Sequence, residues 1–293
     1  MSAFVQQVVY ALNAGSIYAL YALGVGLLFG ILRLLNFAHA GLITAGGYCL
    51  VLTDGAPLPV RIAVTVGVCV ALSLLLDLLV FRQLRGASPA TLLIVSFGVS
   101  VALAGVAEMA FGSLGRSTDL APAFSRSWEL GTVTIKAGSV VNIVVAAVLL
   151  IALVAFLNGT RAGISMRGAA EDFRTARLLG VRANRVIALA FAISGVLAAA
   201  AAVLLVGSKE LVTPDFGMNP LLFGFIAAVL GGLTSLKGAV LGGYALGIAG
   251  QILQTVLPVD IRPFRDAVLF VGVFLLLVLR PQGLVGSQQG VRV

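Results

Sequence analysis

The sequence predicts an all-α, polytopic helical membrane protein. Three observations indicate this class: 60% of the 293 residues are hydrophobic, the mean hydropathy is +1.12, and only 10% of the residues are charged. A soluble domain carries about 25% charged residues. An apolar excess of this size is typical of chains whose helices are surrounded by lipid.

The apolar residues fall into nine segments, which we expect to form a single transmembrane domain over residues 1–293. A helix needs about 20 residues to cross a bilayer, so the segments 37–53 and 266–280 are short for this purpose. The nine segments are 5–31, 37–53, 60–81, 89–112, 139–157, 184–206, 220–236, 238–256 and 266–280.

The segments 220–236 and 238–256 form either two spans or one re-entrant hairpin that enters from outside. We therefore expect about 8–9 membrane segments. Lys237 lies between the two segments, and a lysine near the bilayer midplane costs several kcal/mol. Two spans, with Lys237 at the cytoplasmic edge, are the less costly arrangement.

The basic residues predict the orientation of the chain. The net charge is +8, but the basic residues are dispersed between apolar segments, which is typical of topology-setting loops and not of nucleic-acid binding. If the loop 158–185 is cytoplasmic, 12 Lys and Arg residues lie inside and 7 outside. We therefore expect the N-terminus outside and the C-terminus inside, with membrane lipid but no nucleic acid as a partner.

No catalytic constellation stands out in the sequence, so we do not expect an enzyme. Motifs of P-loop ATPases, zinc proteases and serine hydrolases are absent. Cys49 and Cys69 lie in apolar segments without metal-ligand spacing, so we expect both to be buried. No chain of acids runs through successive segments, which disfavours a proton-driven carrier. We expect no cofactor or metal in this chain, and any energy input must come from another subunit.

The segment 158–185 is the most informative part of the chain. It contains six arginines and only two acids, Glu171 and Asp172, between long apolar segments. Residues from Ser165 to Leu179 predict a short amphipathic helix, with Ser165 as its cap and a left-handed Gly180 at its end. Its apolar face would carry Ala169, Phe173, Ala176 and Leu179, and its basic face Arg167, Arg174 and Arg177. The helix either rests on anionic lipid headgroups or docks into a cytoplasmic ATPase.

The only histidine, His39, follows Asn36 at the start of a short apolar segment. One interpretation makes Asn36 a helix cap and His39 a hydrogen-bonded residue near the cytoplasmic interface. The other makes them a gate or hinge in a transport pathway. Both interpretations stay open at this stage.

Other pathway candidates are an ionisable residue and a pair of glycines. Glu108 lies near the outer end of an apolar segment, where it either lines a pathway or snorkels to the interface. Asp77 lies at the inner end of another segment and can pair with Arg82 or Arg85. Gly231 and Gly232 either allow close helix packing or mark a broken helix beside a pathway.

The outer loop 113–138 contains Trp128 and a possible short strand at 132–135. It is either a docking surface for an external partner or a solvated loop with Trp128 at the membrane interface.

Across nearly its whole length, the chain resembles the membrane permeases of bacterial ABC importers for branched-chain amino acids and related small polar solutes. It is most similar to the shorter of the two permeases that such importers carry. Five stretches carry the resemblance: GSIYALYALGVGLLFG, ILRLLNFAH, EDFRTARLLGVRANRV, VLGGLTSLKGAVLGG and RDAVLFVGVFLLLVLRPQGLVG. Two positions depart from the family pattern, because Ala40 replaces a usual glycine and Lys237 stands where many members have proline.

The resemblance implies a subunit of the bacterial inner membrane that forms half of a translocation pathway. Its partners would be a second permease, two cytoplasmic ATPases that bind ATP and Mg, and a periplasmic solute-binding protein. The residues implied in ATPase coupling are Arg167, Glu171, Asp172, Phe173, Arg174, Arg177 and Gly180. A permease for urea or amides, or a self-sufficient carrier or channel, remains the alternative.

Overall fold

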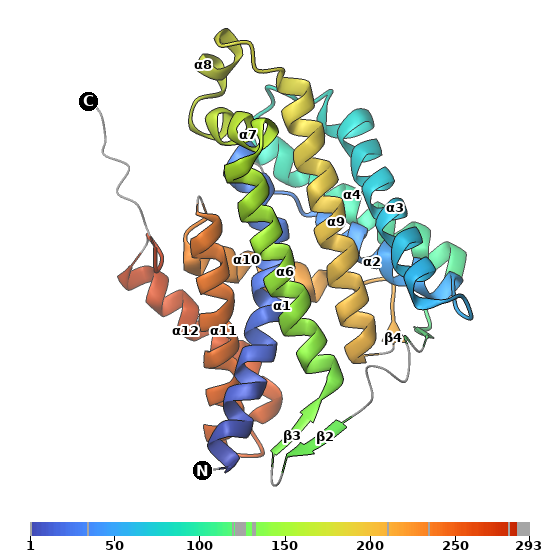
Figure 1. The fold of residues 1–293 in the computed structure, drawn as a ribbon, viewed down its shortest axis with the longest axis vertical. Coiled ribbons are helices and arrows are strands. Elements are labelled where there is room, and N and C mark those ends of the chain that lie inside the picture. The colour runs from blue at the N-terminus through green and yellow to red at the C-terminus, as the bar shows by residue number, and fades with distance from the viewer. Residues whose placement is uncertain are drawn as a thin grey trace.

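The fold is a bundle of long apolar helices with a small helical loop at one end and short strands at the other (Figure 1). It is known from a computed structural model that describes residues 2–33, 35–118, 120, 127–130, 133–209, 211–233, 235–280 and 282–285. Six of its described helices are long and apolar enough to cross a membrane. The predicted helical fold with several candidate membrane spans is therefore confirmed, whereas the number of crossings stays a prediction.

The long helices are α1 (Ser2–Leu32), α3 (Leu58–Leu76), α4 (Pro89–Phe111), α6 (Ala137–Gly159), α9 (Ala183–Lys209) and α11 (Leu236–Val256). A π-helical turn, η1 (Asp77–Phe81), extends α3. The shorter elements are α2 (Ala38–Leu52), α7 (Arg161–Glu171), α8 (Phe173–Leu178), α10 (Met218–Gly231), the 3-10 turn η2 (Arg262–Phe264) and α12 (Arg265–Leu279).

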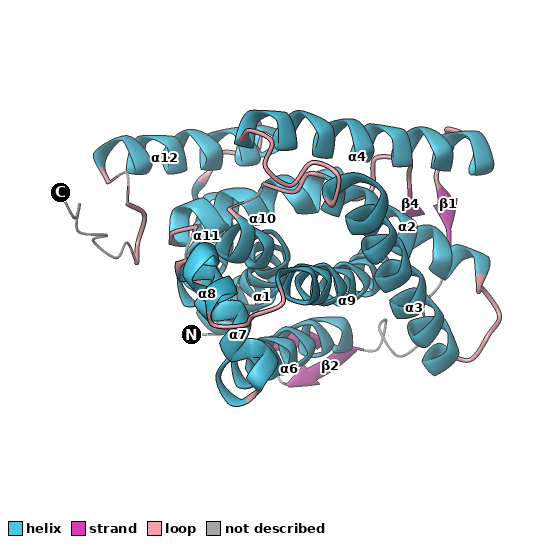
Figure 2. Cartoon of the chain, turned by 90° about the horizontal axis from the view of Figure 1, so that it is seen from above, coloured by secondary structure: helices cyan, strands magenta, loops and turns pink. Residues whose placement is uncertain are grey.

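The helices α1 and α9 form the centre of the bundle, where most of their central residues are buried (Figure 2). α10 and α11 pack on one side of α1, while α2 and α3 pack on α9. In contrast, α3, α4 and α6 expose large apolar side chains, of which Met109 is 82% exposed. Apolar surface of this extent on long helices is suited to contact with lipid or with other membrane subunits.

Glycines bring the backbones of α1 and α11 into direct contact. A Cβ atom added at Gly247 would lie 2.3 Å from the backbone nitrogen of Gly15, and one at Gly243 would lie 2.4 Å from the Cα of Ala19. In lipid no hydrophobic force drives helices together, so close contact between small residues supplies the packing energy. Close packing therefore accounts for the glycines of this helix pair.

Two short helices, α2 and α10, meet inside the bundle. They contain 15 and 14 residues, which gives lengths of about 22 and 21 Å against a bilayer core of about 30 Å. The backbone N–H of Gly217 donates to Thr44 Oγ1 at 3.0 Å, and a Cβ at Gly217 would lie 2.0 Å from the carbonyl oxygen of Ala40. This contact places the first turn of α10 directly against α2.

The end of the bundle opposite α7 carries two small antiparallel sheets. β2 (Ser127–Leu130) pairs with β3 (Val133–Lys136), and β1 (Arg116–Ser117) pairs with β4 (Leu211–Val212). The side-chain amide of Gln6 donates to the carbonyl of Thr134 and accepts from its N–H, both at 2.9 Å, which ties the hairpin to α1. The short strand expected near 132–135 is thus present as β3. We call this end the hairpin end.

Each end of the bundle contains an ion pair with one buried member. At the hairpin end the buried guanidinium of Arg61 donates to Leu50 O at 2.8 Å and forms an ion pair with Asp54 at 3.4 Å. At the α7 end Arg85 forms an ion pair with the buried Asp77 at 3.1 Å, as the sequence suggested. Both cysteines are buried and free, as expected.

The contact between α1 and α11 predicts that Gly247→Ala lowers the melting temperature of the purified protein by several degrees, because the new methyl group has no space beside Gly15. Gly250→Ala on the same helix is the matched control, since its nearest neighbour would lie 3.9 Å away. The two melting temperatures are measured in one detergent. Equal stability of the two variants would contradict the close contact.

Candidate functional site

The α7–α9 loop, residues 160–185, is held against the end of α6 by a tight turn. Thr160 caps α7, since its hydroxyl oxygen accepts from the N–H of Gly163 at 2.9 Å and donates to Phe156 O at 2.8 Å. A Cβ at Gly163 would lie 2.3 Å from Phe156 O, so only glycine permits this turn. Ser165, the cap expected from the sequence, lies inside α7 and donates to the carbonyl of Arg161. That expectation was wrong because Thr160, at the actual break in the helix, supplies the cap.

One face of α7 packs into the core of this chain. Met166 and Ala169 are buried in the same apolar cluster as residues of α1 and α9. Arg167 and Glu171 are exposed on the remaining surface. Part of the apolar face that the sequence offered to a partner is therefore used within the chain, and it fixes α7 to the bundle.

The prediction of a single helix from Ser165 to Leu179 is wrong, because the helix is interrupted at Asp172. This residue has φ −146° and ψ 103°, which is an extended conformation. Its carboxylate accepts from the N–H of Thr175 at 3.1 Å and from the Thr175 hydroxyl at 2.5 Å. An aspartate is a strong N-cap, and here it starts the separate helix α8.

α8 ends at Gly180, as expected. Gly180 has φ +87°, and the N–H of Val181 donates to Ala176 O at 3.0 Å in the pattern of a Schellman cap. Ala176 is buried, whereas Leu178 and Leu179 are 83% and 81% exposed. Two large apolar side chains at the tip of a polar loop indicate a contact surface. Phe173 and Arg174 belong to α8, but their side chains lie outside the described residues.

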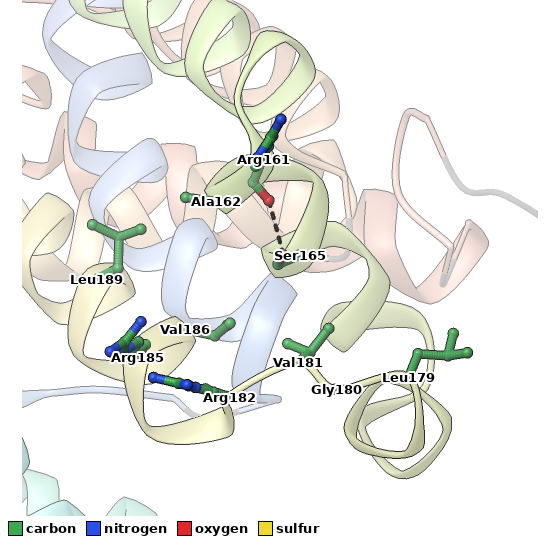
Figure 3. Close-up of a pocket in the computed structure, with 10 residues that line it drawn as sticks. All are labelled: Arg161, Ala162, Ser165, Leu179, Gly180, Val181, Arg182, Arg185, Val186 and Leu189. Carbon is green, nitrogen blue, oxygen red and sulfur yellow. Dashed lines mark hydrogen bonds between the residues drawn. The ribbon is translucent and has the colours of Figure 1, made fainter.

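Two basic hollows lie beside this tip. The first, of about 540 Å³, is lined by Leu179 of the α8 tip and by Arg161, Arg182 and Arg185 (Figure 3). The second, of about 810 Å³, is lined by Arg85, Arg177, Arg182 and Arg185. Among the described residues that line either hollow there is no acid. The surface is therefore complementary to a partner that offers acidic and apolar side chains.

The second hollow is connected to the helices of the bundle. Arg85 hydrogen-bonds Asn184 at the start of α9 as well as Asp77 at the end of α3. A contact at the hollow is thus linked to α3 and to the buried helix α9. The sequence did not place Arg161, Arg182 and Arg185 among the residues expected to couple to an ATPase. These three arginines meet around one hollow only because the chain turns at Thr160 and at Gly180.

The pathway candidates lie apart from this surface. Asn36 is 3% exposed, and its side-chain oxygen accepts from the N–H of Ala38 at 3.1 Å, although the N-cap position of α2 is the next residue, Phe37. His39 is 1% exposed and its Nδ1 lies 3.1 Å from Ser194 Oγ. Ser194 lies about 16 Å along α9 from the first residue of that helix, so His39 is held well inside the bundle, and both of its interpretations stay predictions.

The other three pathway candidates do not join this pair. Glu108 is exposed on α4 near the hairpin end. Gly231 ends α10, and a Cβ there would lie 1.8 Å from the carbonyl oxygen of Gly238. Gly232 has φ +104° and terminates the helix. For both glycines, close packing and a left-handed turn supply a structural reason, and a role in a pathway stays a prediction.

The long apolar helices and the basic loop at one end define a polytopic membrane protein with a polar contact surface. Residues 7–279 match the model of one protein family. The chain belongs to this family, which is described as the branched-chain amino acid transport system / permease component. The resemblance noted in the sequence is thereby confirmed.

Named relatives cover nearly the whole chain. It is 32% identical to the high-affinity branched-chain amino acid transport system permease protein BraD of Pseudomonas aeruginosa, over 98% of this chain and 97% of BraD. It is also 32% identical to the corresponding protein LivH of Escherichia coli K12, over 98% of this chain and 96% of LivH. A probable permease of Methanocaldococcus jannaschii is 28% identical over 83% of this chain and 79% of its own length. No solved structure matches the chain significantly.

Replacing Asp172 by alanine is expected to loosen α8, because loss of an N-cap costs about 1 kcal/mol. Amide hydrogen exchange over residues 173–179 should become roughly fivefold faster, which corresponds to that free energy. Asp172→Asn should keep the slower exchange, since asparagine caps as well as aspartate. Equal acceleration in both variants would show that the negative charge, and not the cap, holds the helix.

Proposed function

We propose that this chain is the permease subunit of an ATP-driven ABC importer in the bacterial inner membrane. It forms half of a translocation pathway for branched-chain amino acids or related small amino acids. Membership in the family over residues 7–279 carries this proposal. The names of the relatives BraD and LivH support the class of substrate.

The α7–α9 loop is proposed as the surface that contacts a cytoplasmic ATPase. The exposed Leu178 and Leu179 supply an apolar contact, and the arginines of the two hollows supply complementary charge. The loop is continuous with α6 and α9, so movement of the ATPase would be transmitted to both helices. ATP and Mg would be bound by the ATPase subunits, and this chain would respond to their closure.

The orientation and the other partners complete the proposal. The basic loop at the α7 end supports a cytoplasmic position for this end, in line with the positive-inside rule. The N-terminus then lies outside, and the C-terminus inside. The hairpin end would face a periplasmic solute-binding protein, with Trp128, 52% exposed on β2, as a contact residue. A second permease would complete the pathway.

Charge reversal at the loop tests ATPase coupling. Arg177→Glu combined with Arg182→Glu should reduce the ATPase that co-purifies with the permease at least tenfold, because like charges placed across an interface cost several kcal/mol. The matched control is Arg116→Glu with Arg262→Glu, two exposed arginines at the hairpin end. Unchanged assembly and uptake in the first variant would contradict coupling through this loop.

Reconstitution separates the subunit from a self-sufficient carrier or channel. The purified chain alone in liposomes should move no radiolabelled leucine. Uptake should begin only when the second permease, the ATPases, the binding protein and Mg-ATP are supplied. Leucine flux through the single chain would support the carrier alternative, and transport of urea in preference to leucine would support the amide alternative.

A further inference from the structure

The surface between α6 and α11, where both helices meet α1, is hollowed by two cavities, and we call this surface the α6–α11 groove. Both helices pack on α1, and Figures 1 and 2 show them on either side of it. Two cavities line this groove. The one nearer the α7 end has a volume of about 290 Å³ and contacts Leu27 and Ile31 of α1. The deeper one has a volume of about 110 Å³ and contacts Leu20 and Leu23 of the same helix.

The two cavities are aligned along the bundle. They share the same three helices, and their positions on α1 run from Ile31 to Leu20. At 1.5 Å per residue this is a distance of about 16 Å. It equals about half of the 30 Å hydrocarbon core, which is the depth of one lipid leaflet.

The ends of the groove differ in chemistry. The deeper cavity is lined almost entirely by apolar groups, whereas the outer cavity has Arg167 of α7 and Lys237 of α11 at its edge. Both cations are exposed, and neither makes an ion pair within the described part of the chain. α11 begins beside them, with Ser235 as its cap, so its positive dipole end adds to the same field.

We propose that this groove binds a phospholipid with a net negative headgroup. The headgroup phosphate would lie between Arg167 and Lys237, and one acyl chain would follow the groove to the cavity at Leu20 and Leu23. A free phosphate or a soluble anion would occupy only the basic edge. The apolar depth of one leaflet below the cations is therefore the feature that selects a lipid.

The bound lipid would connect the α7–α9 loop to the membrane helices. Its headgroup contacts α7 from one side and the first turn of α11 from the other. This assigns Arg167 to a contact different from that of Arg177 and Arg182, which lie at the hollows beside α8. The lipid site does not depend on ATPase coupling, and the two proposals can fail separately.

Native mass spectrometry of the full chain in detergent measures the retention of lipid. Phosphatidylglycerol should bind more tightly than phosphatidylcholine. Arg167→Gln with Lys237→Gln should weaken phosphatidylglycerol binding about 25-fold, since each cation near an anionic surface contributes roughly a factor of five. Inorganic phosphate should not compete at concentrations that leave the protein intact. Equal retention of both lipids, or displacement by phosphate, would overturn the proposal.

A second variant fills the groove without touching its charges. A Cβ at Gly30, which lines the outer cavity, meets no atom within 4 Å, so Gly30→Leu can be accommodated. It should reduce phosphatidylglycerol binding at least tenfold by occupying the acyl path. The matched control is Gly67→Leu on the exposed face of α3, where a Cβ also meets no atom within 4 Å. If Gly30→Leu retained as much phosphatidylglycerol as Gly67→Leu does, the proposed lipid site would be wrong.

Discussion

The direct contact between the backbones of α1 and α11 is the constraint on which the rest of the structure depends. At Gly15, Gly243 and Gly247 no side chain separates the two backbones, so the helices approach more closely than larger residues would permit. α1 then serves as the floor for its other neighbours. α1 contacts α10 and α11 on one side, and it contacts α6 and α7 as well. The position of α1 therefore sets the positions of these four helices and of the groove beside α6.

The two ends of the bundle have different physical properties, and this asymmetry gives the fold a direction. At the α7 end, short caps at Thr160, Asp172 and Gly180 build a loop whose leucines and arginines remain exposed. At the hairpin end, the sheets and the buried Arg61 tie the helix ends together. A loop rich in exposed cations beside the helix bundle suits a contact that transmits movement, as the proposed ATPase coupling requires.

Much of the fold follows from the sequence, because a hydrophobic segment in lipid can form little except a helix. The Asp77–Arg85 pair and the turn at Gly180 could be predicted for local reasons, since both involve residues close in sequence. The break at Asp172 was missed because periodicity favoured a continuous helix, while the aspartate caps a new one. The depth of His39 was missed because tertiary contacts with α1 and α9 set it.

Contact between the tip of the α7–α9 loop and a cytoplasmic ATPase is the interaction that the proposed coupling requires most directly. A cysteine at position 179 can carry a photoreactive maleimide, and the native Cys49 and Cys69 are buried. Leu179→Cys is labelled and irradiated in membranes that contain the assembled transporter, and the crosslinked partner is identified by mass spectrometry. The account predicts a product with the ATPase subunit. A product with the periplasmic solute-binding protein, or with lipid alone, would contradict it.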